Sequence, residues 1–383
     1  MFFRIFILAA ALWCAASLAA AEPARVKVGF FVDNGSRGSG VLYWARLLHY
    51  SPQLEVTLLD GKDIRDGKLD GLDLLMVPGG ASGTQCRMMG EEGKAALRRF
   101  VASGGSYLGV CAGYHCTLNR PERISLFPYT ISPEHYGGMA PLAMELSEKG
   151  AKLLDIPAGR YVVRYSHGPI AVPAPLKGGG EAEVLGVYRA FVGPAGRPGR
   201  NFFGKPAILY GNYGKGKVIA TSFHPESREG TYCIALGCIY AVTGVKPTPL
   251  FPVRSYRPIR VGYCSSAIAG KRCIREVLEL DRDREIDLRF VDIEALEVGE
   301  LSHLDVMIFS AGVEASYKKV MTPRRIAAVK EFMDRGGRVL ASGNGAAFLP
   351  AHPHLRTLPV GESFTTAAKL PPDPPAAEKQ SAN

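Results

Sequence analysis

Short apolar runs alternate with amphipathic segments along the first third of the chain. Apolar runs at 26–32, 54–59 and 72–77, and a fourth that leads directly into Cys111, have the length of buried strands. Apolar residues at helical spacing predict helices at 42–48 and 91–102. Strands that are apolar throughout and alternate with helices are typical of a parallel sheet covered on both faces. We therefore predict an α/β fold with a doubly wound, mostly parallel sheet.

The pattern changes between residues 142 and 223. Short β runs follow one another there with glycine-rich turns between them, at 161–165, 184–188, 207–210 and 218–223. Residues 211–217 carry three glycines between the last two runs and predict a hairpin. This hairpin leads into His224-Pro225-Glu226.

The second part of the chain repeats the first at a constant offset of 232 residues. Asp73, Ala95, Ala96, Phe100, Gly104, Gly105, Leu108 and Gly113 recur as Asp305, Ala327, Ala328, Phe332, Gly336, Gly337, Leu340 and Gly345. Gly343 stands where Cys111 stands in the first copy. We therefore interpret residues 259–349 as a degenerate, non-catalytic repeat of the same fold that packs on the first copy.

The two ends of the chain and one internal segment differ in composition from the rest. A charged start, an apolar run and Ala19-Ala20-Ala21 predict a secretory signal peptide at 1–21, so we expect export, to a periplasm, with no stable membrane insertion after cleavage. A proline-rich linker at 246–258 separates a first domain at 26–245 from the repeat. Residues 350–383 are proline-rich and predict a disordered tail.

Charge and cysteine count narrow the function classes. Removal of the signal segment takes away Arg4 and Cys14, which lowers the formal charge from +10 to +9 and the cysteine count from eight to seven. The positive charge is spread along the chain without a basic run, so we expect no nucleic-acid partner. An odd count leaves at least one thiol unpaired; Cys264 and Cys273 are the favoured disulfide, and Cys233 and Cys238 are expected to be buried on a helix.

A cysteine flanked at ±2 by glycine stands at the end of the fourth apolar run, in Gly109-Val110-Cys111-Ala112-Gly113. Strand, tight turn and helix in this order can leave the central side chain exposed on a sharp corner, as in a nucleophile elbow. Cys111 is then the nucleophile. The alternative is an ordinary glycine-rich turn of an α/β sheet with a buried cysteine in it.

The His224-Pro225-Glu226 segment offers partners for this cysteine. Because the proline ends the strand while side chains still alternate, His224 and Glu226 tend to face the same side. A histidine that takes the thiol proton, oriented by a carboxylate, is the general arrangement for activating cysteine. The N–H of Ala112 and the Gly79-Gly80 loop after the third strand are candidate oxyanion donors.

These motifs together resemble a known family. The segments that carry the resemblance are Val77 to Gly80, Gln85-Cys86-Arg87, Gly104 to Gly113, Tyr165-Ser166-His167-Gly168, and Gly214 to Val218 before His224-Pro225-Glu226. In this order they resemble the biotin-protein ligase N-terminal domain family, which has the flavodoxin-like class I glutamine amidotransferase fold. The resemblance covers residues 26–245 and implies that Cys111 is the nucleophile, His224 the base and Glu226 its orienting group.

The chain also departs from that family. A second copy follows where a ligase often follows, and the Gly-Arg-Gly-Arg-Arg-Gly adenylation motif is missing, so we expect no biotin ligase activity. His167 replaces an expected asparagine and, with Cys86, is a candidate pocket residue; a structural histidine is the alternative.

Three hypotheses remain open from the sequence. The first is a cysteine amidase or hydrolase acting on a small-molecule or peptide-like amide, without cofactor or metal. The second is a non-catalytic envelope ligand-binding or interaction module on the same fold. The third is a redox role for Cys111 with Cys86 or Cys116. The substrate and the oligomeric state stay open.

Overall fold

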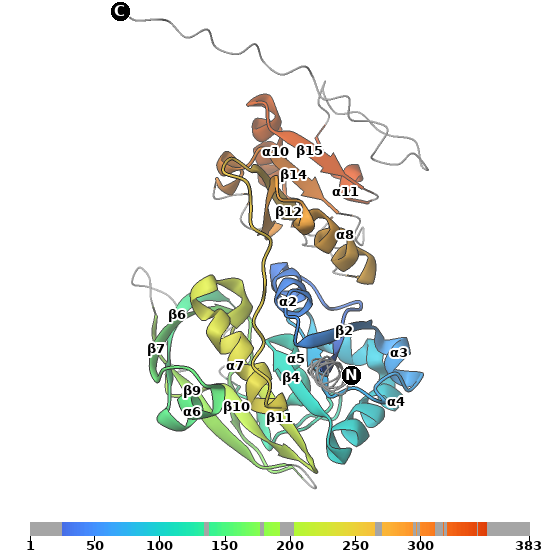
Figure 1. The fold of residues 1–383 in the computed structure, drawn as a ribbon, viewed down its shortest axis with the longest axis vertical. Coiled ribbons are helices and arrows are strands. Elements are labelled where there is room, and N and C mark those ends of the chain that lie inside the picture. Colours follow the sequence, from blue (N-terminus) through green and yellow to red (C-terminus); the bar gives the residue numbers. More distant parts are fainter. Residues whose placement is uncertain are drawn as a thin grey trace, which may run out of the picture.

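The computed structural model describes residues 25–350 except 134–137, 177–179, 192–202, 265–269, 294–295, 297–298, 311–316, 318–319 and 343. The predicted signal peptide lies outside the described residues, and so does the predicted tail apart from its first residue, Pro350. The structure consists of two bodies, each built around its own sheet (Figure 1).

The larger body contains a nine-stranded sheet in the order β2-β1-β3-β4-β11-β10-β9-β6-β7. Its parallel part consists of β1 (Val26–Phe31), β2 (Leu54–Leu59), β3 (Leu74–Val77), β4 (Ser106–Val110) and β11 (Gly216–Thr221). Its antiparallel part adds β10 (Pro206–Tyr213), β9 (Ala182–Phe191), β6 (Met139–Leu146) and β7 (Gly159–Ser166). A short pair, β5 (Tyr129–Ile131) and β8 (Ala171–Pro173), stands beside it.

Helices cover both faces of this sheet. Helices α2 (Ser39–His49) and α7 (Tyr232–Thr243) pack into one apolar core, and α6 (Glu148–Leu154) joins them. On the other face α3 (Gly61–Arg65), α4 (Ser82–Ser103) and α5 (Ala112–Thr117) form a second core. The prediction of an α/β fold with a mixed, mostly parallel sheet is confirmed at this level.

The predicted helix at 91–102 is present and is preceded by a second helical segment that the apolar spacing did not indicate. Element α4 begins at Ser82 and consists of two helical segments that meet at Gly90, whose φ of +68° is not helical and is one that glycine adopts without strain; the second segment contains the predicted helix. Strand β6 and helix α6 were not predicted individually, because Pro141 and Glu145 interrupt the apolar pattern of β6.

The smaller body repeats the topology of the first four strands. Its parallel sheet has the order β13-β12-β14-β15, built from β12 (Ile259–Cys264), β13 (Ile286–Val291), β14 (Val306–Phe309) and β15 (Arg338–Ala341). Helices α8 (Lys271–Arg282), α10 (Pro323–Asp334) and α11 (Asn344–Ala347) and the 3-10 turn η5 (Glu300–His303) accompany it. The domain boundaries at 245, 258 and 349 stay predictions.

Local contacts recur at the repeat offset. The Asp73 carboxylate accepts a hydrogen bond from the N–H of Lys27 at 2.8 Å, and the Asp305 carboxylate accepts one from the N–H of Arg260 at 2.8 Å. A Cβ on Gly105 would lie 2.3 Å from the Phe100 ring, and one on Gly337 would lie 2.4 Å from the Phe332 ring. The 232-residue periodicity therefore corresponds to the same local packing in both bodies.

The two bodies pack against each other through α2 and α8 (Figure 1). One apolar core includes residues of both, and the Tyr43 and Phe290 rings meet edge to face at 4.9 Å. Arg46 forms a salt bridge of 2.8 Å with the buried Asp281 of α8. The segment that connects the two bodies, residues 246–258, is also bound to α8, since the Arg254 guanidinium donates a hydrogen bond to the Asp281 carbonyl at 2.7 Å.

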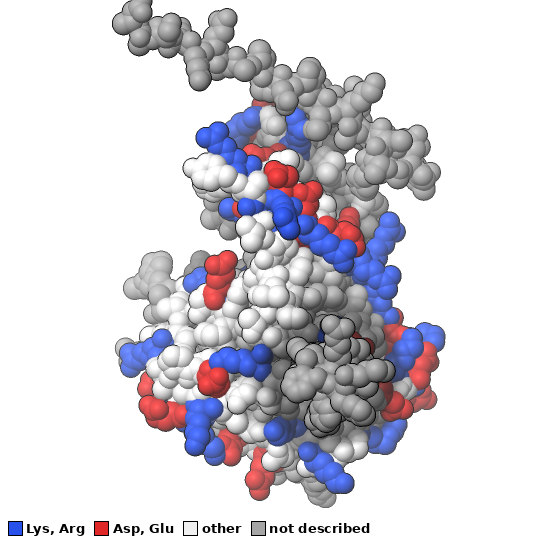
Figure 2. All heavy atoms as spheres, in the orientation of Figure 1, with Lys and Arg blue, Asp and Glu red and all other residues white. Residues whose placement is uncertain are grey.

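Charges are distributed over the surface without a single-sign area on the face drawn in Figure 2, where basic and acidic side chains lie next to one another on both bodies. Among the described residues, no helix combines the length and the apolar character needed to cross a bilayer.

All seven cysteines within the described residues are free thiols. The expected Cys264–Cys273 disulfide is therefore wrong, and the reason is that these side chains belong to cores on different faces of the small sheet. Cys238 is buried as predicted, whereas Cys233 is only partly buried.

Candidate active site

Cys111 stands at a tight turn between β4 and α5, with φ of +52° and ψ of −97°. The flanking glycines are required by close approach. A Cβ on Gly109 would lie 2.6 Å from the Gly113 backbone, and one on Gly113 would lie 2.0 Å from the carbonyl oxygen of Val77. Strain of this kind in a non-glycine residue is typical of functional turns, and here it fixes the direction of the cysteine side chain.

His224 reaches the same edge of the sheet from the neighbouring strand. Strands β4 and β11 are parallel, with Val110 opposite Thr221, so both lead to the carboxyl edge where open α/β sheets place their sites. The N–H of His224 donates to the Arg164 carbonyl at 2.9 Å, which ends the strand in a defined position. The imidazole of His224 and the Cys111 side chain border the same glycine, since a Cβ on Gly79 would lie 2.6 Å from Cε1 of His224 and 3.6 Å from the Cys111 Cβ.

Glu226 orients the imidazole from the other side. It lies in the 3-10 turn η2 (Pro225–Ser227), is fully buried, and places Oε1 2.7 Å from Nδ1 of His224. Glu226 therefore occupies Nδ1 of the His224 ring and not Nε2. The structure thus brings Cys111, His224 and Glu226 together in the order that a thiol nucleophile, its base and an orienting carboxylate need.

The electrostatics of this trio favour a protonated histidine. Burial by itself lowers the pKa of His224, but the negative charges of Glu226 and of the Cys111 sulfur outweigh it and raise the pKa to about 10. An imidazolium beside a sulfur stabilises the thiolate form, which is the nucleophilic one. The buried Glu226 carboxylate therefore holds a positively charged imidazole next to the Cys111 turn.

The predicted oxyanion loop lies against the same side chains. A Cβ on Gly79 would lie 2.6 Å from Cε1 of His224 and 3.6 Å from the Cys111 Cβ. The loop is held by two bonds, from the Arg37 N–H to the Gly79 carbonyl at 3.4 Å and from the Ala81 N–H to the Gly35 carbonyl at 2.7 Å. Neither of these two hydrogen bonds uses the N–H group of Gly79 or of Gly80.

Ala112, the third predicted oxyanion donor, is the first residue of α5 and directly follows the nucleophile. The first N–H groups of a helix have no partner within the helix and are available to a developing negative charge.

The two predicted pocket residues have different positions. His167 adjoins Ser166, whose carbonyl lies 3.3 Å from the Cys111 sulfur, and it adopts a left-handed φ of +54°. The exposed His167 therefore lies at the rim of the site. Cys86 instead meets Cys116, with 3.3 Å between the two sulfur atoms.

Sequence reasoning missed a group of residues that support the His224–Glu226 pair. A Cβ on Gly40, at the start of α2, would lie 2.3 Å from Oε1 of Glu226, so this helix packs directly on the pair. Asp292 of the smaller body accepts hydrogen bonds from the N–H of Ser39 at 3.0 Å and from its hydroxyl at 3.1 Å. Its carboxylate also pairs with Arg164, the residue whose carbonyl holds His224.

Asp292 is ionised in this setting. Burial raises the pKa of its carboxyl, but the Arg164 charge and the bonds from Ser39 outweigh burial and hold the pKa below its usual range. No local motif marks Ser39, Arg164 or Asp292, because they come from three distant segments. The only signal in the sequence is an acidic residue at the end of an apolar run.

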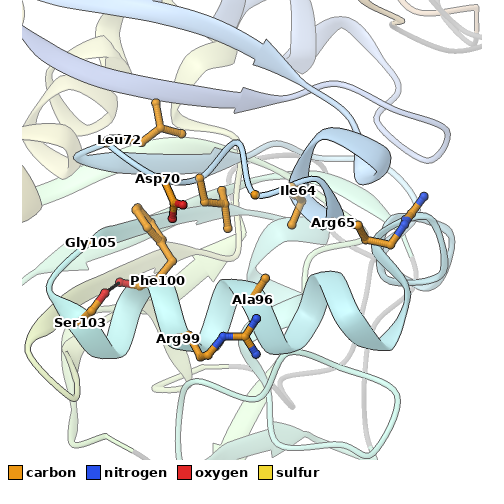
Figure 3. Close-up of a pocket in the computed structure, with 12 residues that line it drawn as sticks. Ile64, Arg65, Asp70, Leu72, Ala96, Arg99, Phe100, Ser103 and Gly105 are labelled. Carbon is orange, nitrogen blue, oxygen red and sulfur yellow. Dashed lines mark hydrogen bonds between the residues drawn. The ribbon is translucent and has the colours of Figure 1, made fainter.

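A pocket of about 460 to 530 Å³ occurs in each body, at the edge opposite the cysteine. The larger one lies between the loop after α3 and the end of α4 (Figure 3). Leu69, Leu72, Phe100 and Gly105 line it, and their repeat equivalents Leu301, Leu304, Phe332 and Gly337 line the smaller one. Because both bodies have it, this hollow is a property of the shared fold, and the elbow is the better candidate site.

Comparison with known proteins gives relatives for the larger body. The family described as biotin-protein ligase, N terminal, matches residues 51–120. A biotin–protein ligase of Schizosaccharomyces pombe is 28% identical over 173 residues, which is 41% of this chain and only 26% of that ligase.

Pyridoxal 5'-phosphate synthase subunit PdxT of Deinococcus radiodurans is 30% identical over 168 residues, which is 43% of this chain and 75% of that subunit. Among solved structures, PurLQS from Thermotoga maritima is similar with a TM-score of 0.41 and 15% identity, over 56% of this chain and 98% of that one. From the family match and the extent of the PdxT similarity, the chain belongs to the class I glutamine amidotransferase-like family that includes the biotin-protein ligase N-terminal domain.

Proposed function

We propose that this protein is an exported, thiol-dependent amidohydrolase with a Cys111-His224-Glu226 triad. The observation that carries the proposal is that the imidazole of His224 lies beside the Cys111 turn, against Gly79, and is hydrogen-bonded to the fully buried Glu226. The substrate class is a small-molecule or peptide-like carboxamide, and no part of the proposed chemistry needs a cofactor.

In the proposed reaction, the His224 imidazole holds the proton of the Cys111 thiol, and the sulfur attacks the carbonyl carbon of the amide. The carbonyl oxygen becomes an oxyanion that faces the N–H groups of Ala112 and of the Gly79-Gly80 loop. His224 then returns its proton to the leaving nitrogen, which departs as ammonia or an amine. Water, deprotonated by His224, hydrolyses the thioester and restores the free cysteine.

Export is part of this proposal and is supported by the pattern at residues 1–21. Biotin ligation is not proposed, because the sequence lacks the adenylation motif that the resemblance would require.

The first test is the reactivity of the thiols. Native protein treated with limiting iodoacetamide at neutral pH and analysed by mass spectrometry should carry the adduct on Cys111 before the more exposed Cys233. Ammonia release from glutamine and from a panel of simple carboxamides, compared with Cys111→Ala, then measures turnover. Labelling of Cys111 that is no faster than that of Cys233 would overturn the proposal.

A non-catalytic ligand-binding or interaction module is the second candidate function. It is favoured by the low exposure of Cys111, which is 4%, and by the second copy, which keeps its sheet without a cysteine at the position equivalent to Cys111. Full cellular function of a Cys111→Ala protein would support this candidate and exclude the amidohydrolase.

A further inference from the structure

Two thiols lie close together beneath the nucleophile turn. Cys86 is on α4, and Cys116 is on α5, the helix that begins directly after Cys111. Their sulfur atoms are 3.3 Å apart, and the residues are 3% and 0% exposed. A disulfide brings two sulfur atoms to about 2 Å, so a movement of about 1 Å separates this contact from a bond.

The surroundings of the pair differ from those of an ordinary buried thiol. The contact with the Cys116 thiol lowers the pKa of Cys86 to about 7, while burial opposes this shift and the charge of Arg123 assists it. The guanidinium of Arg123 lies 3.9 Å from the Cys86 sulfur. Cys238 is equally buried, but burial raises the pKa of its thiol. Cys86 is thus prepared to act as a thiolate.

Gln85 of α4 connects the pair to the loop that precedes this helix. The Cys116 sulfur lies 3.8 Å from Oε1 of the buried Gln85, and Nε2 of Gln85 donates to the Pro78 carbonyl at 3.0 Å. Pro78 directly precedes the Gly79-Gly80 loop. A bond between the two sulfurs would therefore tie the helix of the nucleophile to the helix of the oxyanion loop.

We propose that Cys86 and Cys116 form a disulfide when the chain folds in the presence of a disulfide-exchange oxidant. The Cys86 thiolate attacks one sulfur of the oxidant's disulfide, which forms a mixed disulfide and releases the first oxidant thiolate. Cys116 loses its proton and attacks the Cys86 sulfur, which forms the Cys86–Cys116 bond and releases the second. Two cysteine thiols are oxidised, and the oxidant's disulfide is reduced to two thiols.

This inference goes beyond the proposed function and does not depend on it, because Cys111 takes no part in the bond. It also differs from the redox hypothesis drawn from the sequence, in which Cys111 was one partner. Cross-linking residues that are 30 positions apart restricts the unfolded chain, so the oxidised protein should be the more stable form.

The decisive experiment is a disulfide map. The full chain is folded in glutathione buffers of graded oxidation, its thiols are trapped with N-ethylmaleimide in denaturant, and the protein is digested without reduction. Mass spectrometry should find the Cys86 and Cys116 peptides joined and adducts on the other five of the seven described cysteines. Separate peptides at every glutathione ratio, or a bond to Cys111, would overturn the proposal.

Melting temperatures measure whether the bond tethers the two helices. We expect oxidised wild type to melt about 5 to 10 °C above the reduced form. This difference should vanish in Cys86→Ser and Cys116→Ser and persist in the matched control Cys238→Ser. An unchanged melting temperature with the bond present would refute the stabilising effect of the bond. If the serine variants do not fold, the disulfide map of the wild type and the melting difference between its oxidised and reduced forms still test the proposal.

A disulfide map of Cys111→Ala, together with iodoacetamide labelling of the wild type, separates this inference from the proposed function. Cys111→Ala protein should still form the Cys86–Cys116 bond, and a wild-type protein without the bond would leave the test of Cys111 reactivity unaffected. A missing bond in Cys111→Ala, with the bond present in wild type, would contradict the independence of the two.

Discussion

The two copies of the four-strand unit are alike at one edge of their sheets and different at the other. At the amino edge, Asp73 and Asp305 brace their sheets with the same hydrogen bond, and each copy has a pocket lined by equivalent residues. At the carboxyl edge, a Cβ on Gly113 would meet Val77 at 2.0 Å, whereas one on Gly345 would meet Phe309 at 2.8 Å. The shared edge reflects the requirements of the fold, and the tighter edge is where we place the chemistry.

The contact between the copies is reciprocal. Asp60 follows β2 and forms a salt bridge of 2.8 Å with Lys271, the first residue of α8. Asp292 follows β13 and accepts bonds from Ser39, the first residue of α2. These positions are related by the 232-residue offset, so the two copies meet as the subunits of a symmetric dimer would. The second copy therefore contributes a support for the site of the first.

The largest expected effect separates the site from the fold. His224→Asn should slow iodoacetamide labelling of Cys111 at pH 7 about 100-fold and amide turnover about 1,000-fold, because the base and the positive charge are lost. His49→Asn, at a partly buried histidine in the last turn of α2, is the control and should label like wild type. Equal labelling in both variants would contradict the triad.

The glycines at the carboxyl edges test the difference between the copies directly. Gly113→Ala places a Cβ against a backbone oxygen and should reduce the free energy of unfolding by at least about 3 kcal/mol. Gly345→Ala meets looser contacts and should cost about 1 to 2 kcal/mol. Urea denaturation measures both, and equal losses would mean that the two turns are equally tight.

The stability of the protein should depend on pH through His224. Its pKa is raised from 6.5 to about 10, so the folded protein binds this proton more tightly than the unfolded chain. The stabilisation is complete below pH 6.5 and is lost as the pH rises toward 10. Urea denaturation across this pH range should show that the free energy of unfolding of the wild type falls by about 2 to 4 kcal/mol. The His224→Gln variant should lack this loss. A parallel loss in the variant would assign the effect to other groups.

The smallest effect concerns the support from the second copy. Asp292→Asn keeps the shape but removes the charge that faces Arg164, and it should cost about 1 to 2 kcal/mol and slow Cys111 labelling several-fold. Asp287→Asn is the matched control, because Asp287 lies on β13, the strand that Asp292 follows, and pairs with Arg289 at the surface. If the two variants label Cys111 at the same rate, the second copy does not position the site.

Much of the fold was predictable from local patterns. The apolar runs of the parallel strands and the 232-residue periodicity predicted the β1 to β4 unit and its second occurrence, because buried strands need continuous apolar residues. The first segment of α4, before Gly90, was not predicted, since only the tertiary structure shows that a second helical segment precedes the one at 91–102. The Cys264–Cys273 disulfide failed because nearness along the chain does not fix the face of the sheet.

By itself the sequence determined the order of the strands, the glycine spacing around Cys111 and the presence of a His-Pro-Glu segment, because these depend on backbone conformation over a few residues. Only the tertiary structure decided that His224 lies beside the Cys111 turn, that Cys86 meets Cys116, and that Asp292 of the second copy holds Ser39 and Arg164 of the first. These contacts join segments from 30 to more than 250 residues apart, and their geometry follows from the packing of whole elements.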